Sequence, residues 1–172
     1  MKKGYIQVYT GNGKGKTTAA LGLAMRAAGA GLKVYFVQFL KGRKNSEHIS
    51  LEKFKNHITV RQYGNKSFLT GRPTSADICM AKKGFLDAKR AVYNKEYDLI
   101  VLDEVFFAIN LKLIKLDDVI TLLKTKPCSV EIVLTGRKSP LKIIETADLV
   151  TEMKEIKHYF KSRVKARLGI EY

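Results

Sequence analysis

Six short apolar runs recur along the chain, and helix-like stretches separate them. Alternation of this kind predicts a parallel α/β sheet. The runs at 99–102 and 130–134 are nearly continuous in Val, Ile and Leu, which is typical of central strands covered by helices on both faces. The six predicted strands cover residues 5–10, 33–39, 58–62, 98–103, 130–135 and, with a weaker pattern, 148–153.

Several of the stretches between these runs have sequence patterns that are typical of helices. A helix is predicted over 17–30, after the glycine-rich turn that follows the first predicted strand. Residues 77–93 carry apolar side chains at helical spacing, and the sequence from Thr74 to Asp77 predicts a capping box in front of them. A further helix is predicted over 116–124.

Three segments show no clear element. Residues 40–57 and 64–72 each follow a predicted strand and carry Gly, Lys, Arg and Asn. Because ligands bind beyond the carboxyl ends of parallel strands, both loops are candidates for substrate contact. The polar and basic residues after 153 lack periodicity, and we expect them to wrap across the sheet edge or a site.

Composition narrows the class of protein. The chain has 172 residues, 45% hydrophobic and 28% charged, which predicts one globular domain spanning residues 1–172. No apolar run approaches the roughly 20 residues that cross a bilayer, and the first residues carry no signal-peptide core, so we expect a cytoplasmic protein with no membrane partner. Cys79 and Cys128 are too few for a disulfide scaffold, and we expect each to be a small buried hydrophobe.

The charge is strongly positive. Lys and Arg number 32 against 16 Asp and Glu, so the formal net charge is +16. This value predicts an anionic partner, although nucleic acid, nucleotide, a membrane surface and an acidic protein would all qualify. The chain has no recognisable nucleic-acid-binding motif, and aromatic residues are not interleaved with the basic clusters, so we expect no nucleic-acid partner.

The strongest chemical signal is YTGNGKGKTT at 9–18, between the first predicted strand and helix. Strand, glycine-rich turn and helix follow one another in this order in phosphate-binding P-loops. Glycines allow backbone N–H groups to converge on phosphate oxygens, and the helix N-terminus adds partial positive charge. Lys16 supplies a mobile cation, and Thr17 offers the hydroxyl that usually completes a Mg²⁺ shell.

This loop departs from the generic pattern GxxxxGK[ST] at its first position, where Thr10 stands in place of glycine. We therefore expect the tight turn to shift onto Gly11 and Gly13.

Another of the predicted strands lies in DLIVLDE at 98–104, a segment that ends in two acidic residues. An acid that emerges at the carboxyl end of this strand faces the P-loop, as in a Walker B motif. Either Asp103 or Glu104 would hold Mg²⁺, directly or through water, and the other would orient it or act as a base. Without the P-loop, the simpler interpretation of this motif would be a buried strand followed by the N-cap of a helix.

Two arginines are candidates for nucleotide contact. Arg137 closes another predicted strand at the same sheet edge, where a phosphate contact and a surface ion pair are equally supported. Arg26 lies nine residues beyond Thr17, and its position favours a solvated side chain. The three histidines show no metal-ligand spacing.

From the residues alone, the chain is a small Mg²⁺-dependent protein that binds a nucleoside triphosphate. P-loops serve hydrolases, kinases and motors alike, and residue spacing does not indicate which bond of ATP is broken.

Several longer motifs occur in order along the chain. They are YTGNGKGKTTAALGLAMRAAG at 9–29, VQFLKG at 37–42, DLIVLDE at 98–104, VEIVLTGR at 130–137, ADLVTEM at 147–153, and IKHYF and GIEY near the end. With these motifs, the chain closely resembles the P-loop corrinoid adenosyltransferases over nearly its whole length. The resemblance implies a RecA-like P-loop NTPase fold, with a mostly parallel sheet and helices on both faces. It further implies that ATP lies reversed along the loop and that cobalt(I) of a reduced corrinoid attacks its 5′ carbon, giving adenosylcobalamin or its precursor and triphosphate.

The resemblance assigns roles by position. Thr17 and Glu104, with Asp103, would hold magnesium, and Lys16 would stabilise charge on the departing polyphosphate. Arg26 would bind the nucleotide, although its position alone favours a solvated side chain. Arg137 would contact phosphate or corrin. The residues implied to bind ATP are Gly11, Asn12, Gly13, Lys14, Gly15, Lys16, Thr17, Thr18, Arg26 and Arg137.

The family must also remove the lower axial ligand of cobalt(II), which suits bulky apolar side chains under the corrin. The chain contains no Trp that could serve in this way, so Phe68 is the candidate for this catalytic role. The alternative for the Phe68 side chain is ordinary packing in the core. The resemblance also implies reduced flavin or flavodoxin as electron donor and a homodimer. A basic surface would steer an acidic flavodoxin.

Two other functions remain open from the sequence. A P-loop ATPase or kinase acting on nucleic acid or nucleosides would release ADP or phosphate. A corrinoid carrier gated by ATP would bind its ligands without turnover.

Overall fold

The computed structural model describes residues 2–65, 71–159 and 161–172. Six strands form one sheet in the order β3-β2-β4-β5-β1-β6, and every neighbouring pair is parallel. Each strand matches a predicted run to within one residue at either end. The strands are β1 (Ile6–Thr10), β2 (Val34–Phe39), β3 (Ile58–Tyr63), β4 (Leu99–Asp103), β5 (Glu131–Thr135) and β6 (Leu149–Glu152).

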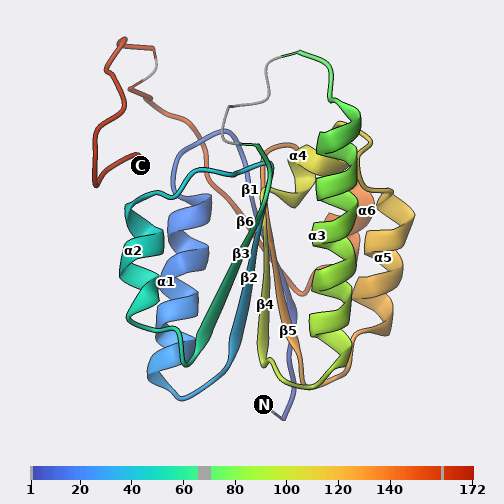
Figure 1. Ribbon diagram of the computed structural model, residues 1–172. Helices are drawn as coiled ribbons and strands as arrows, with labels where there is room; N and C mark the ends of the chain where they lie inside the picture. Colours follow the sequence, from blue (N-terminus) through green and yellow to red (C-terminus); the bar gives the residue numbers. More distant parts are fainter. Residues whose placement is uncertain (1, 66–70, 160) are drawn as a thin grey trace.

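Helices cover both faces of this sheet, as predicted (Figure 1). One face carries α1 (Lys16–Gly29) and α2 (Ser46–Glu52). The other carries α3 (Ser75–Tyr93), α4 (Val105–Asn110), α5 (Leu116–Thr125) and α6 (Leu141–Thr146). The short helix α2 lies in the segment 40–57, to which the sequence pattern assigned no element.

The central strands β2, β4 and β5 are buried at every residue, which explains their near-continuous apolar sequence. On the α1 face, Ala20 and Ala24 pack in the cluster that contains Phe36 and Val101 of the sheet. Small side chains let α1 approach the sheet closely. The P-loop that precedes α1 is thereby held at the carboxyl ends of the central strands.

Helix α3 begins with the predicted capping box. The Thr74 hydroxyl accepts from the Asp77 backbone N–H at 3.3 Å, and the Asp77 carboxylate accepts from the Thr74 backbone N–H at 2.8 Å. Two backbone donors at the start of the helix are thus satisfied reciprocally.

Both cysteines are exposed, so the expectation of burial is wrong. The buried stripe of α3 runs through Ala81, Gly84 and Ala88, and Cys79 is not on it. Cys128 lies in the turn before β5, outside the packed layers.

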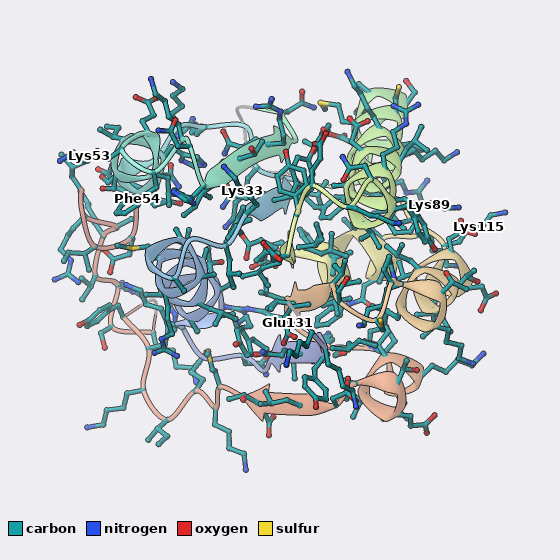
Figure 2. The ribbon with its side chains drawn as sticks, turned by 90° about the horizontal axis from the view of Figure 1, so that it is seen from below. Lys33, Lys53, Phe54, Lys89, Lys115 and Glu131 are labelled. Atoms are coloured by element: carbon teal, nitrogen blue, oxygen red, sulfur yellow. The ribbon has the colours of Figure 1, made fainter. Side chains whose placement is uncertain are left out.

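Basic side chains are distributed over the outside of the molecule. Figure 2 shows Lys53, Lys89 and Lys115 at the periphery, whereas Glu131 lies at the sheet. Among the described residues, no helix is long and apolar enough to cross a membrane.

The chain after β6 crosses the P-loop edge, as expected. The Met153 N–H donates to the Thr10 carbonyl at 2.8 Å, and the Gly13 N–H donates to the Met153 carbonyl at 2.7 Å. The final residue reaches α2, where the Ser46 hydroxyl donates to the Tyr172 carbonyl at 2.9 Å. This C-terminal segment therefore lies on the same side of the molecule as α1 and α2 (Figure 1).

Candidate active site

The glycine-rich loop takes the shape of a phosphate-binding turn. Gly11 and Gly15 have φ angles of 96° and 119°, a region that disfavours other residues, and Gly15 is the N-cap of α1. The expected shift of the turn is thus correct for Gly11. Gly13 does not have a positive φ; it is required because a Cβ there would lie 2.7 Å from the Met153 carbonyl oxygen.

Lys16, the first residue of α1, folds back over the loop. Its ammonium donates to the carbonyls of Gly11 at 2.9 Å and Gly13 at 2.7 Å. Burial lowers the pKa of Lys16, while the carboxylates of Glu104 and Asp103 act in the opposite direction. A partly desolvated cation therefore lies inside the loop.

Asp103 joins the P-loop to the sheet. It ends β4 and is fully buried. Its Oδ1 accepts from the Thr17 hydroxyl at 2.9 Å and from the Thr135 hydroxyl at 2.7 Å. The carboxyl ends of β4 and β5 and the start of α1 thus converge on one carboxylate.

The other oxygen of Asp103 faces β2 and the residues after it. Oδ2 accepts from Gln38 Nε2 at 3.1 Å and from Lys41 Nζ at 2.9 Å. Burial acts to lower the pKa of Lys41, but the Asp103 carboxylate raises it and the net shift is upward. Gln38 Oε1 in turn accepts from Gln62 at 3.2 Å and contacts His48 Nε2 at 2.7 Å.

Glu104 follows β4 in a left-handed conformation, with φ of 61°, and its N–H donates to Thr135 Oγ1 at 3.0 Å. It occupies the N-cap position of α4, but its side chain makes no capping hydrogen bond. Burial raises the pKa of Glu104, and the neighbouring Asp103 raises it further. The Glu104 carboxylate does not cap the helix and is therefore available to bind a ligand.

The donors at this edge fit a hard divalent cation. Thr17, Asp103 and Glu104 offer hydroxyl and carboxylate oxygens, the ligands that Mg²⁺ prefers. Mg²⁺ usually takes only one or two carboxylates and completes its shell with water and phosphate. The described part of the chain contains no cluster of three or more His, Cys, Asp or Glu that could hold a metal ion without other ligands.

Comparison with known proteins shows the family of the chain. The sequence profile of the family described as ATP:corrinoid adenosyltransferase BtuR/CobO/CobP matches residues 2–172. The corrinoid adenosyltransferase of Escherichia coli (strain K12) is 37% identical over 99% of this chain and 87% of that protein. The corrinoid adenosyltransferase CobA of Salmonella typhimurium (strain LT2) is 38% identical over the same shares.

The chain belongs to the ATP:corrinoid adenosyltransferase family. It is an enzyme that transfers the adenosyl group of ATP to a reduced corrinoid. The resemblance carried by the P-loop and the later motifs is thereby confirmed.

A solved structure supports the fold of this adenosyltransferase. The KaiC-like protein PH0186 of Pyrococcus horikoshii OT3 superposes with a TM-score of 0.56 at 15% sequence identity, over 90% of this chain and 75% of that one. The fold is the RecA-like P-loop NTPase fold, as predicted.

Other implied nucleotide-binding residues of the adenosyltransferase occupy different positions. Arg137 is exposed, and its positive charge adds to the lowering of the Lys16 pKa by burial and acts against the net rise of the Glu104 pKa. Arg26 lies in the last turn of α1, ten residues from Lys16 and so about 15 Å along the helix axis. The structure therefore brings Arg137 to the site edge and leaves Arg26 away from Lys16.

One exposed P-loop side chain, Lys14, contacts the C-terminal segment. The Lys14 ammonium donates to the Ile170 carbonyl and to Glu171 Oε1, each at 3.1 Å, and lies over the Tyr159 ring. Asn12 and Thr18 are exposed. Phe68, the predicted wedge below the corrin, lies outside the described residues.

Three site residues were not singled out from the sequence. Gln38, Lys41 and Thr135 all contact Asp103. They lie within the family motifs VQFLKG and VEIVLTGR, but none of them had a predicted role from the sequence. Their common signal was position, since each lies at or just beyond the carboxyl end of a predicted strand.

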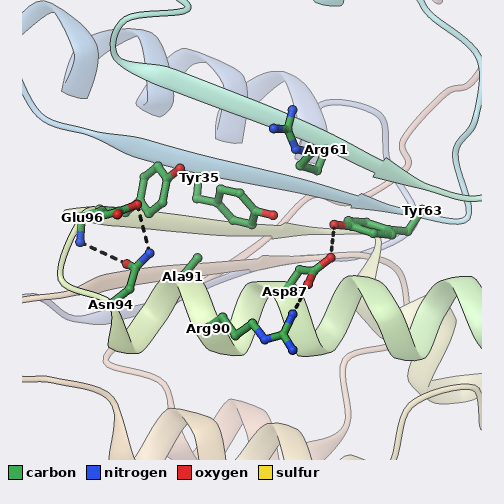
Figure 3. A pocket seen from close by; sticks show the side chains of 9 residues that line it. Tyr35, Arg61, Tyr63, Asp87, Arg90, Ala91, Asn94 and Glu96 are labelled. Atoms are coloured by element: carbon green, nitrogen blue, oxygen red, sulfur yellow. Dashed lines mark hydrogen bonds and ion pairs between the residues drawn. The ribbon is translucent and has the colours of Figure 1, made fainter.

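A hollow lies between strands β2 and β3 and helix α3 (Figure 3). It measures about 290 Å³, and its polar groups pair with one another: Tyr63 donates to Asp87 at 2.7 Å, and Arg90 pairs with Asp87 at 3.2 Å. Its lining includes Asn94 and Glu96, which precede β4 at the amino ends of the strands. The hollow is therefore separate from the P-loop edge.

Proposed function

We propose that adenosyl transfer takes place at the edge where the P-loop meets the carboxyl ends of β2, β4 and β5. The observation that carries this proposal is the hydrogen bond from Thr17 to the buried Asp103. It ties the loop of a nucleotide-binding motif to an acid at the end of a central strand, which is the arrangement that P-loop proteins use for a triphosphate and its metal.

The protein's task in this reaction is to stabilise a leaving group. The electron pair of cobalt(I), supplied by the substrate, forms the bond to the 5′ carbon of ATP, and the bond from that carbon to oxygen breaks. Triphosphate departs with the electron pair of that bond. Lys16 and the loop N–H groups of residues 11–17 would stabilise its growing charge, so no nucleophilic side chain is required.

Thr17, Asp103 and Glu104 would hold Mg²⁺ beside the triphosphate. The ion would supply positive charge that neutralises the polyphosphate. Support comes from the oxygen donors that these three side chains bring to one edge, and from the absence of a side-chain capping bond at Glu104.

The remaining assignments rest on the family resemblance. Arg137 would contact phosphate or corrin, Arg26 the nucleotide, and Phe68 would displace the lower axial ligand of cobalt. We further propose a cytoplasmic homodimer, with reduced flavin or flavodoxin as the donor of the electron that reduces cobalt(II) of the corrinoid substrate to cobalt(I). The net charge of +16 supports an acidic electron donor.

One incubation tests the reaction. The protein is mixed anaerobically in the dark with Mg-ATP and chemically reduced cobalamin, and both corrinoid and nucleotide products are separated by chromatography. We expect light-sensitive adenosylcobalamin together with triphosphate. ADP and phosphate without adenosylated corrin would instead indicate an ATPase or kinase, and tight corrinoid binding without turnover would indicate a carrier.

A further inference from the structure

The backbone just beyond β2 is held in an unusual conformation. Leu40 has a φ of 56°, a left-handed value that costs energy in a bulky residue. Its N–H donates to the Tyr63 carbonyl at 2.8 Å, which continues the pairing of β2 with β3 by one step. The chain therefore turns sharply at Leu40, and Lys41 is the first residue after the turn.

Two glycines fix this turn against the neighbouring loop. A Cβ on Gly42 would collide with the carbonyl oxygen of Gly64, and a Cβ on Gly64 would collide with the backbone of Leu40. The loops after β2 and β3 thus pack backbone to backbone, an approach that only glycine permits. Such tight packing limits where the Lys41 side chain can project.

The Lys41 ammonium lies among the groups proposed to hold the metal. Its Nζ is 2.9 Å from Asp103 Oδ2 and 3.4 Å from Thr17 Oγ1, and the side chain is 27% exposed. A buried carboxylate needs a positive partner, and Lys41 is the cation that pairs with Asp103 among the described residues. A divalent cation on Thr17 and Asp103 would occupy the same neighbourhood and repel the ammonium.

We propose that the Lys41 ammonium alternates with the divalent cation as the partner of Asp103. Without the metal, the ammonium holds Asp103 and Thr17 in place. When the metal and the triphosphate bind, the ammonium leaves Asp103 and turns on its flexible stem to the phosphate oxygens. This inference rests on the proposed metal site and adds to it a residue of the chain that had no assigned role.

The test measures Mn²⁺ binding, followed by electron paramagnetic resonance, to the protein without nucleotide. In Lys41→Met, which keeps most of the stem and removes the charge, we expect Mn²⁺ to bind about tenfold more tightly, because its competitor is gone. The same variant should bind Mg-ATP about tenfold more weakly, because a phosphate contact is lost.

The matched control is Lys44→Met. Lys44 lies three residues further on in the same loop, is exposed, and pairs with Glu52 at 3.3 Å. Its removal should change neither affinity. Lys41→Arg should retain both affinities within a few-fold, because it keeps the positive charge.

The two affinities must move in opposite directions. If Lys41 is only structural, both affinities fall together with the melting temperature, and the inference is overturned. It is also overturned if Mn²⁺ binds to Lys41→Met no more tightly than to the unaltered protein, including the case of no detectable binding. Neither measurement requires adenosyl transfer, so failure of the product assay would leave this result interpretable.

Discussion

Asp103 is the side chain on which the site is organised. A fully buried carboxylate is costly unless it is hydrogen-bonded and paired, and Asp103 accepts from Thr17, Thr135, Gln38 and Lys41. These donors come from the P-loop helix, from β5, and from the end of β2. One carboxylate thus fixes the relative positions of three segments that are distant in sequence.

Loss of the Thr17 hydroxyl should remove both its bond to Asp103 and a ligand of the proposed metal. We expect Thr17→Ala to lower kcat/KM by about 100-fold or more, the range seen when one preorganised polar group at a developing charge is removed. The measurement is the initial rate with chemically reduced cobalamin. Thr17→Ser keeps the hydroxyl and should retain most of the activity; equal losses in the two variants would contradict the assigned role.

The partly buried Glu104 carboxylate should lower the free energy of unfolding when it is ionised and no ligand is bound. Because its pKa in the folded protein is raised above the ordinary 4.5, the ionised folded state is disfavoured at neutral pH. This destabilisation is absent below about pH 4.5, where Glu104 is protonated in both the folded and unfolded states, and grows as pH rises through the raised pKa.

Glu104→Gln should therefore be more stable than the unaltered protein at pH 7.5 in the absence of metal, while losing activity. The difference in free energy of unfolding should shrink as pH falls toward 4.5, which urea denaturation at several pH values would measure. A difference that stays constant with pH would contradict the assigned ionisation.

The loops at the carboxyl edge are in close contact with one another. The P-loop packs against the chain after β6 through the Gly13 N–H, and the turn after β2 packs against the loop after β3 through Gly42 and Gly64. In each case two backbones lie so close that no Cβ fits. The shape of the site is therefore set by contacts between loops from different strands.

Gly13→Ala tests this dependence. Its Cβ would lie 2.7 Å from the Met153 oxygen and 2.8 Å from the Lys154 oxygen, so the chain after β6 must move and the Gly13 hydrogen bond is lost. We expect weaker ATP binding, by about tenfold or more, in a calorimetric titration.

Gly22→Ala is the matched control for this substitution. A Cβ at Gly22 meets nothing within 4 Å, and the residue lies inside α1. The control should keep ATP affinity and gain roughly 0.5–1 kcal/mol in stability, since alanine is the better helix former. If the two glycine variants lose ATP affinity equally, the loop contact is not the cause.

The charge of the adenosyltransferase acts over longer distances than any of these contacts. A net +16 on 172 residues creates a positive potential around a molecule whose basic side chains lie on its outside (Figure 2). The individual lysines need no separate explanation, but their sum favours encounter with acidic partners.

If flavodoxin is the electron donor, as proposed, the reaction that it drives should slow as salt rises. We expect its rate at limiting flavodoxin to fall by several-fold between low ionic strength and about 0.15 M, where the Debye length is roughly 8 Å. The reaction with chemically supplied cobalt(I) is the control and should change much less. A flavodoxin-driven rate that is independent of salt would contradict electrostatic steering.

Much of this architecture could be predicted from the sequence because the patterns that specify it are local. The six strands, the capping box of α3, the P-loop and the acids that end β4 are each determined by a few consecutive residues, whose spacing or backbone requirements need no distant partner. The family resemblance rests on the same short motifs.

The convergence of Thr17, Gln38, Lys41 and Thr135 on Asp103 has no such local signature. It depends on the strand order, which places β4 between β2 and β5 although other elements separate them in sequence. The exposure of both cysteines, and the C-terminal segment's contacts with Lys14 and Ser46, likewise depend on which surfaces remain uncovered after packing. Residue spacing specifies the elements, whereas contacts between distant segments form only when the sheet assembles, and those contacts build the site.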